Sequence, residues 1–306
     1  MTRAEDRVLE GMTRHGCAAR IVKACRAANL RGDILELGTE NAVDKEFYKE
    51  RLGSFDFKIP DDAHSLIVVA VPRPQSQAIF SFGGQTLALI LPPTYVAYDR
   101  TRKWVENTLS DHLRPDGYSV KRALLPLKLL AAQSGLCHYG RNNICYVDGM
   151  GSFFELVACF SDMPCEDDHW QKPEMMPTCE NCQACRSNCP TGAISNDRFL
   201  LRAERCLVYH NEKNGSIPFP KWIDHSWHNC LVGCMRCQSV CPQDKKFMNW
   251  IVEKEEFSEE ETILLLNETS KDRLPEKTAQ KLANLDLLED VGVLPRNLRV
   301  FLSRVD

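Results

Sequence analysis

Two cysteine runs in the second half of the chain have the residue type and spacing to bind iron–sulfur clusters. In the first run, CENCQACRSNCP, which ends at Pro190, the cysteines are separated by two, two and three residues and are followed by proline. This is the C-x2-C-x2-C-x3-C-P run of bacterial two-cluster ferredoxins. The second run, CLVGCMRCQSVCP, ends at Pro242 and repeats most of the pattern. The two runs therefore predict one device that holds two [4Fe–4S] clusters.

The spacing also predicts which cysteines share a cluster, because the last cysteine of each run ligates the other cluster in such ferredoxins. The ligands predicted for cluster 1 are Cys179, Cys182, Cys185 and Cys241. Those predicted for cluster 2 are Cys189, Cys234, Cys237 and one more cysteine. For that place Cys230 lies one residue too far upstream and Cys206 competes with it, so the spacing leaves both open.

A structural zinc site is the alternative, since C-x2-C pairs also bind zinc. Zinc sites seldom use the full run with its proline, and here the run recurs, so we favour iron–sulfur clusters. The chain has 15 cysteines, and an odd, clustered set fits a disulfide framework poorly. We expect a reducing, cytoplasmic location.

Composition restricts the class of protein. The chain has 306 residues, 43% of them hydrophobic and 26% charged, as in ordinary soluble proteins. No apolar run approaches the roughly 18 residues of a membrane span, and the charged N-terminus is not typical of a secretory signal. The formal charge of −4 becomes about −8 with two bound clusters, so the charge as a whole gives no case for nucleic-acid binding.

The elements that must position the cysteines follow from hydrophobic periodicity. Residues 1 to about 60 look mainly helical, and residues 98–113 and 123–136 also predict helices, the last closing at Gly135. HSLIVVAVPRP and QTLALILPP predict buried strands, as does the end of the segment that closes with FFELVACF. This alternation predicts a layered α/β domain before the cysteine runs.

Four segments resemble the epoxyqueuosine reductase family, which is similar in architecture to the reductive dehalogenases. They are GLCHYGRNN, GMGSFFELV, RCLVYHNE and GCMRCQSVCP, in that order. The resemblance runs from about residue 60 to 250. It implies an α/β (α+β) layered corrinoid-binding domain over residues 1–170 and a bacterial two-[4Fe–4S] ferredoxin-like domain over 171–250. A short helical C-terminal segment, 251–306, completes the expected fold class, and by the same match Cys206 completes cluster 2.

The resemblance also implies that the clusters pass electrons to the cobalt of a base-off cobalamin or other corrinoid. The chain lacks a D-x-H-x-x-G motif for a lower-axial histidine. Glycines permit close backbone approach to a large flat ligand, and Arg and Asn side chains offer donors to its rim. The positions expected at the corrinoid are Gly135, Leu136, Cys137, His138, Gly140, Arg141, Asn142, Asn143, Gly149, Gly151 and Ser152.

Catalytic residues are predicted with less support from the sequence. Where the family has a catalytic aspartate, an ungapped alignment back from Gly135 places Lys121, a proton donor if desolvated and otherwise a surface charge. Tyr139 is a second candidate acid, with Tyr95 and Tyr118 as further ones. The family's C-terminal repeat region, which helps to grip transfer RNA, is replaced here by a short segment of mixed charge.

We therefore predict a corrinoid- and iron–sulfur-dependent redox protein, an oxidoreductase acting on a small substrate with electrons from a ferredoxin or flavodoxin. One alternative is a protein that reductively activates a corrinoid-dependent partner. A second is an epoxyqueuosine reductase, with transfer RNA disfavoured by Lys121, the short C-terminus and the acidic balance. A third is a ferredoxin-like reductase without corrinoid. No membrane partner is expected.

Overall fold

The computed structural model describes residues 3–40 and 52–303, which form two compact units. The first unit comprises the chain to Pro72, Asp99–Gln183 and Ile194–Arg202, and the second comprises Arg73–Tyr98, Ala184–Ala193 and the chain from Ala203 onward. The predicted domain boundary at residue 170 does not coincide with this division. Residues 73–98, which precede that boundary, group with the C-terminal elements.

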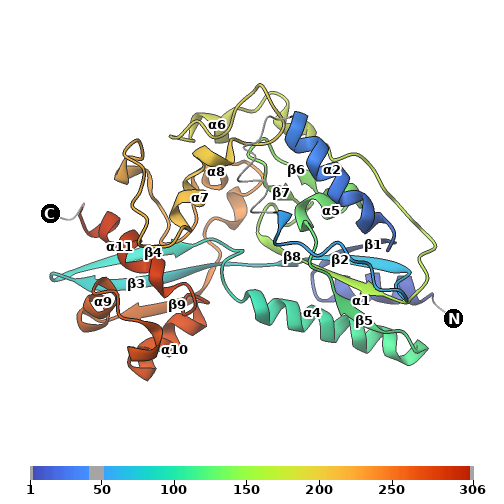
Figure 1. The fold of residues 1–306 in the computed structure, drawn as a ribbon, viewed down its shortest axis with the longest axis horizontal. Coiled ribbons are helices and arrows are strands. Elements are labelled where there is room, and N and C mark those ends of the chain that lie inside the picture. Colours follow the sequence, from blue (N-terminus) through green and yellow to red (C-terminus); the bar gives the residue numbers. More distant parts are fainter. Residues whose placement is uncertain (1–2, 41–51, 304–306) are drawn as a thin grey trace. The chain divides into compact units, whose positions relative to one another are not determined.

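The first unit is built on a four-stranded antiparallel sheet in the order β1-β2-β8-β5 (Figure 1). The strands are β1 (Ala18–Lys23), β2 (Ser65–Pro72), β8 (Phe154–Ser161) and β5 (Val120–Arg122). The predicted strands at HSLIVVAVPRP and FFELVACF are β2 and β8. The prediction of a mainly helical N-terminus is wrong for β1, and part of that prediction, residues 41–51, lies outside the described residues.

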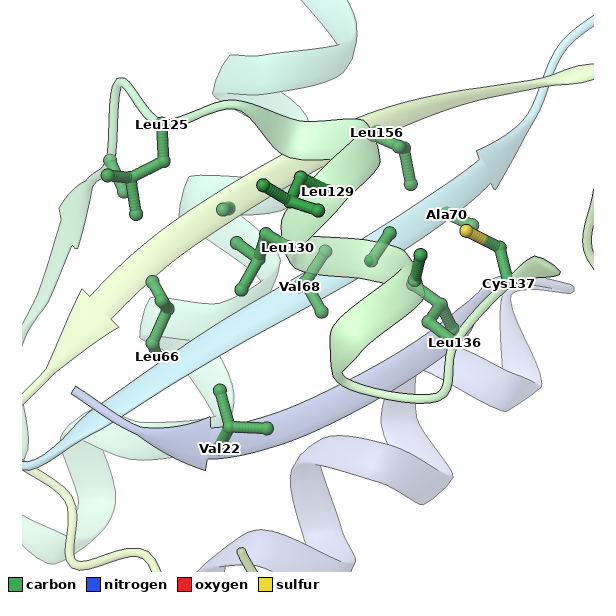
Figure 2. Packing of buried hydrophobic residues seen from close by; sticks show 14 of the residues in the cluster. Val22, Leu66, Val68, Ala70, Leu125, Leu129, Leu130, Leu136, Cys137 and Leu156 are labelled. Atoms are coloured by element: carbon green, nitrogen blue, oxygen red, sulfur yellow. The ribbon is translucent and has the colours of Figure 1, made fainter. Parts of the chain in front are cut away.

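Helices cover both faces of this sheet, which explains why β2 and β8 are apolar on both faces. The helices are α1 (Ala4–Arg14), α2 (Arg26–Glu40), α4 (Tyr98–Leu113) and α5 (Leu127–Gln133). Leu66 and Val68 of β2 pack in a core with Leu129 and Leu130 of α5, as Figure 2 shows, and α2 contributes to the same core. Alternate strand residues, such as Ile67, face a second core with α1 and α4. Because successive strand residues point to opposite faces, one short strand serves both cores.

The end of α5 sets the direction of the segment that follows it. Gly135 adopts a left-handed conformation, with φ of 73°, and the amide of Leu136 donates to the carbonyl of Ala131. This is the expected glycine C-cap, and a Cβ at Gly135 would lie 2.9 Å from the ring of His169. The chain then enters a two-stranded hairpin, β6 (His138–Tyr139) and β7 (Cys145–Tyr146).

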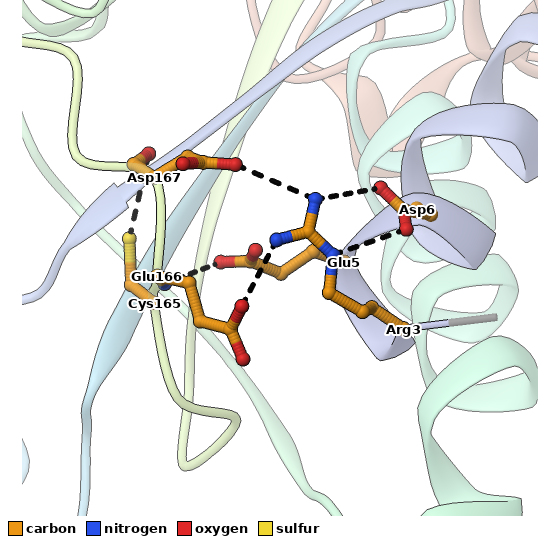
Figure 3. A network of polar contacts seen from close by, with 6 residues as sticks. All are labelled: Arg3, Glu5, Asp6, Cys165, Glu166 and Asp167. Carbon is orange, nitrogen blue, oxygen red and sulfur yellow. Dashed lines mark hydrogen bonds and ion pairs between the residues drawn. The ribbon is translucent and has the colours of Figure 1, made fainter. Parts of the chain in front are cut away.

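The start of α1 is tied to the segment after β8 by a polar network (Figure 3). The Arg3 guanidinium donates to Glu166 Oε2 at 2.9 Å and to Asp6 Oδ2 at 3.2 Å. Glu5 is buried, and its carboxylate accepts from the backbone amide of Glu166 at 2.9 Å. The network therefore fixes the two chain segments that flank the sheet of the first unit.

The second unit has a three-stranded sheet in the order β4-β3-β9. β3 (Gln75–Phe82) and β4 (Gln85–Leu91) form a hairpin that turns through Gly83 and Gly84, both at positive φ. β9 (Ile251–Phe257) pairs parallel to β3. The predicted all-helical segment 251–306 is therefore wrong at its beginning. Three helices follow, α9 (Glu259–Leu266), α10 (Glu276–Asn284) and α11 (Leu294–Leu302).

The cysteine runs lie mostly in loops with very short helices, as expected for ligands that must converge on a cluster. These helices are α6 (Ala184–Ser187), α7 (Leu207–Asn211) and α8 (Arg236–Ser239). α6 and α8 pack together, and Asn188 Nδ2 donates to the carbonyl of Arg236 at 2.5 Å. The part of the first run from Ala184 onward is thus joined to the second run within the second unit.

Candidate functional site

Five cysteines of the second unit lie within electrostatic reach of one another. Desolvation raises the pKa of the Cys237 thiol well above its usual value, and the neighbouring thiols raise it further. Those neighbours are Cys234, Cys206, Cys185 and Cys189. Thiols in such a group stay protonated in the absence of metal, and cluster binding releases their protons. The structure therefore brings together the four cysteines predicted for cluster 2, with Cys185 of the predicted cluster 1 beside them.

The environments of Cys206 and Cys230 differ. Cys206 stands at the start of α7 and interacts with both Cys234 and Cys237. Cys230 is fully buried against β4, where it forms a β-bridge with Ile90. Among the groups that shift the pKa of Cys230, Cys234 is the only cysteine. Burial is the main cause of the raised pKa of the Cys230 thiol. The geometry thus favours Cys206 as the fourth ligand.

A buried polar network holds the segments that carry these cysteines. Asn211, at the end of α7, accepts from the amide of Gly233 through Oδ1 at 2.7 Å. Asn297 of α11 donates to the carbonyls of Asn211 and Leu231, at 3.1 and 2.9 Å. Arg296 donates to the carbonyl of Asn211 at 2.8 Å. This role of α11 could not be predicted from the sequence, because nothing local links residue 297 to the cysteine runs.

In the first unit, Arg141 clamps the loop that carries Cys179 and Cys182. Its guanidinium donates to the carbonyls of Cys179, Cys182 and Glu180, at 2.6, 3.0 and 3.1 Å. It also donates to Asn196 Oδ1 at 3.0 Å. Arg141 was predicted as a donor to a corrinoid, yet these donors are used by the cysteine loop.

The other ligands predicted for cluster 1 belong to the second unit. These are Cys185, on α6, and Cys241, after α8. The grouping of the four cysteines of cluster 1 stays a prediction.

The described residues contain no preformed site for a single metal ion. Across residues 3–40 and 52–303, no three His, Cys, Asp or Glu side chains lie close enough together to hold a single metal ion. A structural zinc site requires ligands about 2.3 Å from one ion, and hence tightly converging thiolates.

Several residues predicted to contact a corrinoid are engaged within the protein. Asn142 is buried, donates to Tyr146 Oη at 2.8 Å and accepts from the amide of Ile144 at 3.2 Å. A Cβ at Gly140 would lie 2.5 Å from the Tyr146 ring, so this glycine is required for packing within the hairpin. A hydrogen bond with Cys145, and then burial, raises the pKa of the Cys137 thiol.

Leu136 and Ser152 are also buried, and Gly135 ends α5. The remaining predicted positions are placed differently. The Asn143 side-chain amide nitrogen is buried and has no hydrogen-bond partner in the described part of the chain. Gly149, at φ of 80°, has open space where a Cβ would stand, whereas Gly151, also at positive φ, is buried. His138 is half-buried on β6. An amide without a partner and an open glycine backbone are both groups that suit the polar rim of a large flat ligand.

The candidate acids are placed very differently. Lys121 is exposed on the edge strand β5, so the desolvation that a proton-donating lysine needs is not found there. Tyr139 is buried, with 6% of its surface exposed, and packs in the core with α5. The Tyr95 hydroxyl donates a hydrogen bond to the Glu212 carboxylate. Burial is the main cause of the raised pKa of Tyr95, and Glu212, Cys206 and Cys230 raise it further. The Tyr95–Glu212 pair was not predicted, although Glu212 closes the quoted segment RCLVYHNE.

Comparison with known proteins supports the cysteine assignment. Residues 178–244 match the family model described as "4Fe-4S double cluster binding domain". This region contains both runs and Cys206. The chain therefore contains a double [4Fe–4S] cluster binding domain. No helix in the described ranges is long and apolar enough to cross a membrane.

Curated relatives named epoxyqueuosine reductase confirm the predicted resemblance. The protein of Pseudomonas aeruginosa is 35% identical over 119 residues, which cover 39% of this chain and 31% of that protein. The protein of Synechococcus is 28% identical over 193 residues, covering 60% of this chain and 56% of that protein. The chain spans about a third of the length of the first curated relatives it matches, between 29% and 38%.

Solved structures show the same fold. The epoxyqueuosine reductase of Streptococcus thermophilus aligns with a TM-score of 0.64 at 16% identity, covering 98% of this chain and 81% of that one. That of Bacillus subtilis gives 0.64 at 20% identity, with 97% and 80% covered. An epoxyqueuosine reductase bound to an epoxyqueuosine-modified tRNA stem loop gives 0.55 at 21% identity, with 79% and 66% covered. The predicted mixed α/β fold with a two-cluster domain is confirmed.

Proposed function

We propose that this protein is an iron–sulfur reductase, and that a modified nucleoside of the epoxyqueuosine type in tRNA is its substrate. The observation that carries the proposal is the group of cysteines around Cys237, inside a region that matches a double-cluster domain. Two clusters move single electrons and cannot by themselves select a substrate. The substrate is proposed from the names of the curated relatives and from the neighbour bound to a modified tRNA stem loop.

Lys121, the short C-terminus and the acidic balance disfavoured tRNA, but for a contact with phosphate local charge matters more than the overall balance. Lys245 and Lys246 are exposed directly after the second cysteine run, and Lys246 lies 4.8 Å from the centre of the Phe247 ring. Basic side chains beside an aromatic ring are suited to a nucleic-acid backbone and an unstacked base. This basic surface of the second unit supports the tRNA proposal.

A corrinoid is the finer part of the proposal. When bound, it supplies a strongly reducing cobalt that accepts electrons from the clusters. Asn143 offers an amide nitrogen without a hydrogen-bond partner among the described residues, and the open backbone at Gly149 permits close approach. Arg141 does not contact it in this proposal, because it holds the loop of Cys179 and Cys182.

The deciding experiment is an anaerobic assay with tRNA that carries epoxyqueuosine. The protein is prepared with about eight irons, the content of two four-iron clusters. It is reduced through a ferredoxin or flavodoxin, with and without cobalamin. Loss of one oxygen from the nucleoside, seen by mass spectrometry, is the expected result, and the corrinoid proposal requires that it depend on cobalamin.

Two outcomes would change the proposal. Conversion without cobalamin would remove the corrinoid and leave an iron–sulfur reductase. Cobalamin uptake without any conversion of tRNA would instead favour another substrate, or a role in reducing a corrinoid-dependent partner. Faster reduction of that partner's cobalt would then be the measurement to make.

A further inference from the structure

The first unit contains a polar cavity of about 590 Å³. It is lined by the first half of α2, by Gln133 at the end of α5 and by the segment 170–172. α2 and α5 contact each other within this unit (Figure 1). Every lining residue belongs to the described ranges 3–40 and 52–303. The volume lies in the range of pockets that enclose small organic ligands.

One acceptor among the side chains that line this cavity has no hydrogen-bond partner. Gln133 is 4% exposed, and its Nε2 donates to Asp33 Oδ2 at 2.8 Å. Its Oε1 has no partner within the described part of the chain. A buried amide oxygen without a hydrogen bond costs free energy, and leucine would fill a similar volume without that cost. The oxygen is therefore explained if a ligand donates a hydrogen bond to it.

The orientation of the Gln133 amide is fixed by its surroundings. Its backbone carbonyl accepts from the amide of Gln171 at 2.9 Å. Its side-chain nitrogen must be the group on Asp33, because a carboxylate oxygen can only accept. Two acceptors, Gln133 Oε1 and the Asp33 carboxylate, are thus held on neighbouring side chains. Such a pair is preorganised for a donor, because little conformational freedom remains to be lost on binding.

The other groups in the lining define the class of donor. Asp33 and Trp170 are both half-buried, so they offer a negative charge and an aromatic ring. The Arg26 guanidinium already lies 5.5 Å from the centre of the Trp170 ring, but its hydrogen-bonding partner is Asp168. Planar cations with adjacent N–H groups, such as guanidinium, pair with carboxylates and stack on aromatic rings.

One lining residue has a charge that opposes a cation. Lys172 lines the cavity, and its side chain is exposed, so solvent screens its ammonium group. Asp33 is less exposed and is hydrogen-bonded to Gln133. Removal of the lysine should therefore strengthen the binding of a cation modestly, whereas removal of the aspartate charge should weaken it more.

We propose that this cavity binds a small planar cation of the amidinium or guanidinium class. Its N–H groups donate to the Asp33 carboxylate and to Gln133 Oε1, and its plane lies against the Trp170 ring. The proposal concerns binding to the first unit alone, so it stands or falls separately from the clusters and from the reduction of any substrate.

The test compares two probes of the same shape. Benzamidine carries an amidinium group, and benzamide has a carbonyl oxygen in place of one nitrogen. Both are titrated by calorimetry into the whole, cluster-loaded chain under anaerobic conditions. We expect benzamidine to bind at least about tenfold more tightly, the gain typical of hydrogen bonds to a charged group.

Variants of the lining test the two charges in opposite directions. Asp33→Asn should weaken benzamidine at least about tenfold and leave benzamide nearly unchanged. Lys172→Met should strengthen benzamidine about twofold to fivefold, as for a screened surface charge. Asp62→Asn removes an exposed carboxylate outside the cavity and is the matched control, which should bind as wild type does.

A cavity-filling variant keeps the test decisive if the polar variants fail to fold. Ala28 is an exposed residue of α2 that lines the cavity, so Ala28→Trp should abolish the binding of benzamidine. Leu35→Trp, at an exposed position of α2 outside the lining, should not. The proposal is overturned if wild type binds neither probe or both equally, if Asp62→Asn weakens benzamidine as much as Asp33→Asn does, or if Ala28→Trp binds as wild type.

Discussion

At the scale of single residues, the chemistry of this protein resides in thiols whose neighbours decide their use. Cys206 and Cys230 are the informative pair, since both are near Cys234 but only Cys206 also reaches Cys237. Full burial against β4 makes Cys230 resemble a small apolar core residue. A fourth cluster ligand must lie near the other thiolates, so Cys206 stays the predicted ligand.

Replacing these two cysteines separately tests the assignment. We expect Cys206→Ser to lose about four of about eight irons, because one four-iron cluster lacks a ligand. Cys230→Ser should keep its iron, although a hydroxyl in that buried place lowers stability. Iron analysis and low-temperature electron paramagnetic resonance of the reduced proteins measure the outcome. Iron loss in Cys230→Ser alone would reverse the ligand assignment.

Arg141 offers a second test at this scale, since one guanidinium holds three carbonyls of the cysteine loop. In Arg141→Met we expect the loop to be destabilised by about 2–3 kcal/mol, through the loss of charge-assisted hydrogen bonds. The variant should release iron to a chelator faster than wild type. Arg202→Met is the control, since it removes an ion pair with Asp197 on an exposed surface, where about 0–1 kcal/mol is typical. Equal iron release from both variants would show that the clamp is unimportant.

At the scale of elements, the first unit depends on joints between strands and helices as well as on its two cores. Asp168 is one such joint. Its carboxylate accepts from the amide of Lys23, at the end of β1, at 3.1 Å. It also accepts from the Arg26 guanidinium, at the start of α2, at 2.7 Å. Its side chain is 11% exposed, so solvent screens this contact less than a surface ion pair.

This joint predicts a specific pH dependence. Burial alone would raise the pKa of Asp168, but the hydrogen bonds from Arg26 and Lys23 outweigh it and the pKa is lowered. A lowered pKa stabilises the folded state above the unfolded value of about 4, and that stability is lost as the pH falls through the folded value. We expect Asp168→Asn to unfold about 1–2 kcal/mol more easily at pH 7.

Urea unfolding at pH 7 and at pH 3 measures this effect, and the difference between Asp168→Asn and wild type should shrink at the lower pH. Asp167→Asn is the control, since the Asp167 side chain is 83% exposed and pairs with Arg3 at 3.5 Å. A difference for Asp168→Asn that stays constant with pH would show that charge is not its cause.

At the scale of the whole molecule, the chain alternates between its two units, and the first cysteine run is divided between them. Cys179 and Cys182 belong to the first unit, while Cys185 and Cys189 belong to the second. The sheet of the first unit has apolar cores on both faces, and no predicted cluster ligand is part of either core. The loops of the second unit carry most of the predicted cluster ligands, so their order depends more on bound metal.

Iron removal should therefore increase hydrogen exchange more in the cysteine loops of the second unit than in the sheet of the first unit. After anaerobic chelation, we expect hydrogen exchange to speed up in residues 184–193 and 203–247, because the cysteines in these segments lose their bound metal. The amides of β2 and β8 should keep their protection from exchange. Adding iron and sulfide should restore the protection of residues 184–193 and 203–247. Simultaneous loss of protection in β2 and β8 would mean that the clusters stabilise the whole chain.

The sequence by itself determined the features that depend on local spacing and periodicity. The cysteine runs indicated two clusters, and apolar runs located β2, β4 and β8. The helix predicted over residues 98–113 matches α4, and the glycine cap predicted at Gly135 is present. These signals are local because ligand spacing, helix period and caps each involve residues close together in the chain.

The tertiary structure decided what depends on partners distant in sequence. β9 is rich in charge and became a strand only because β3, more than 150 residues earlier, offers it hydrogen bonds. The residues of β1 fit a helical pattern in the sequence, and they form a strand because they pair with β2. Arg141 was placed on the cysteine loop, and Gln133 beside Asp33, by the packing of segments from the whole first unit. A side chain's partners are set by the fold, whereas its chemistry is set by its type, and only the second can be known from the sequence.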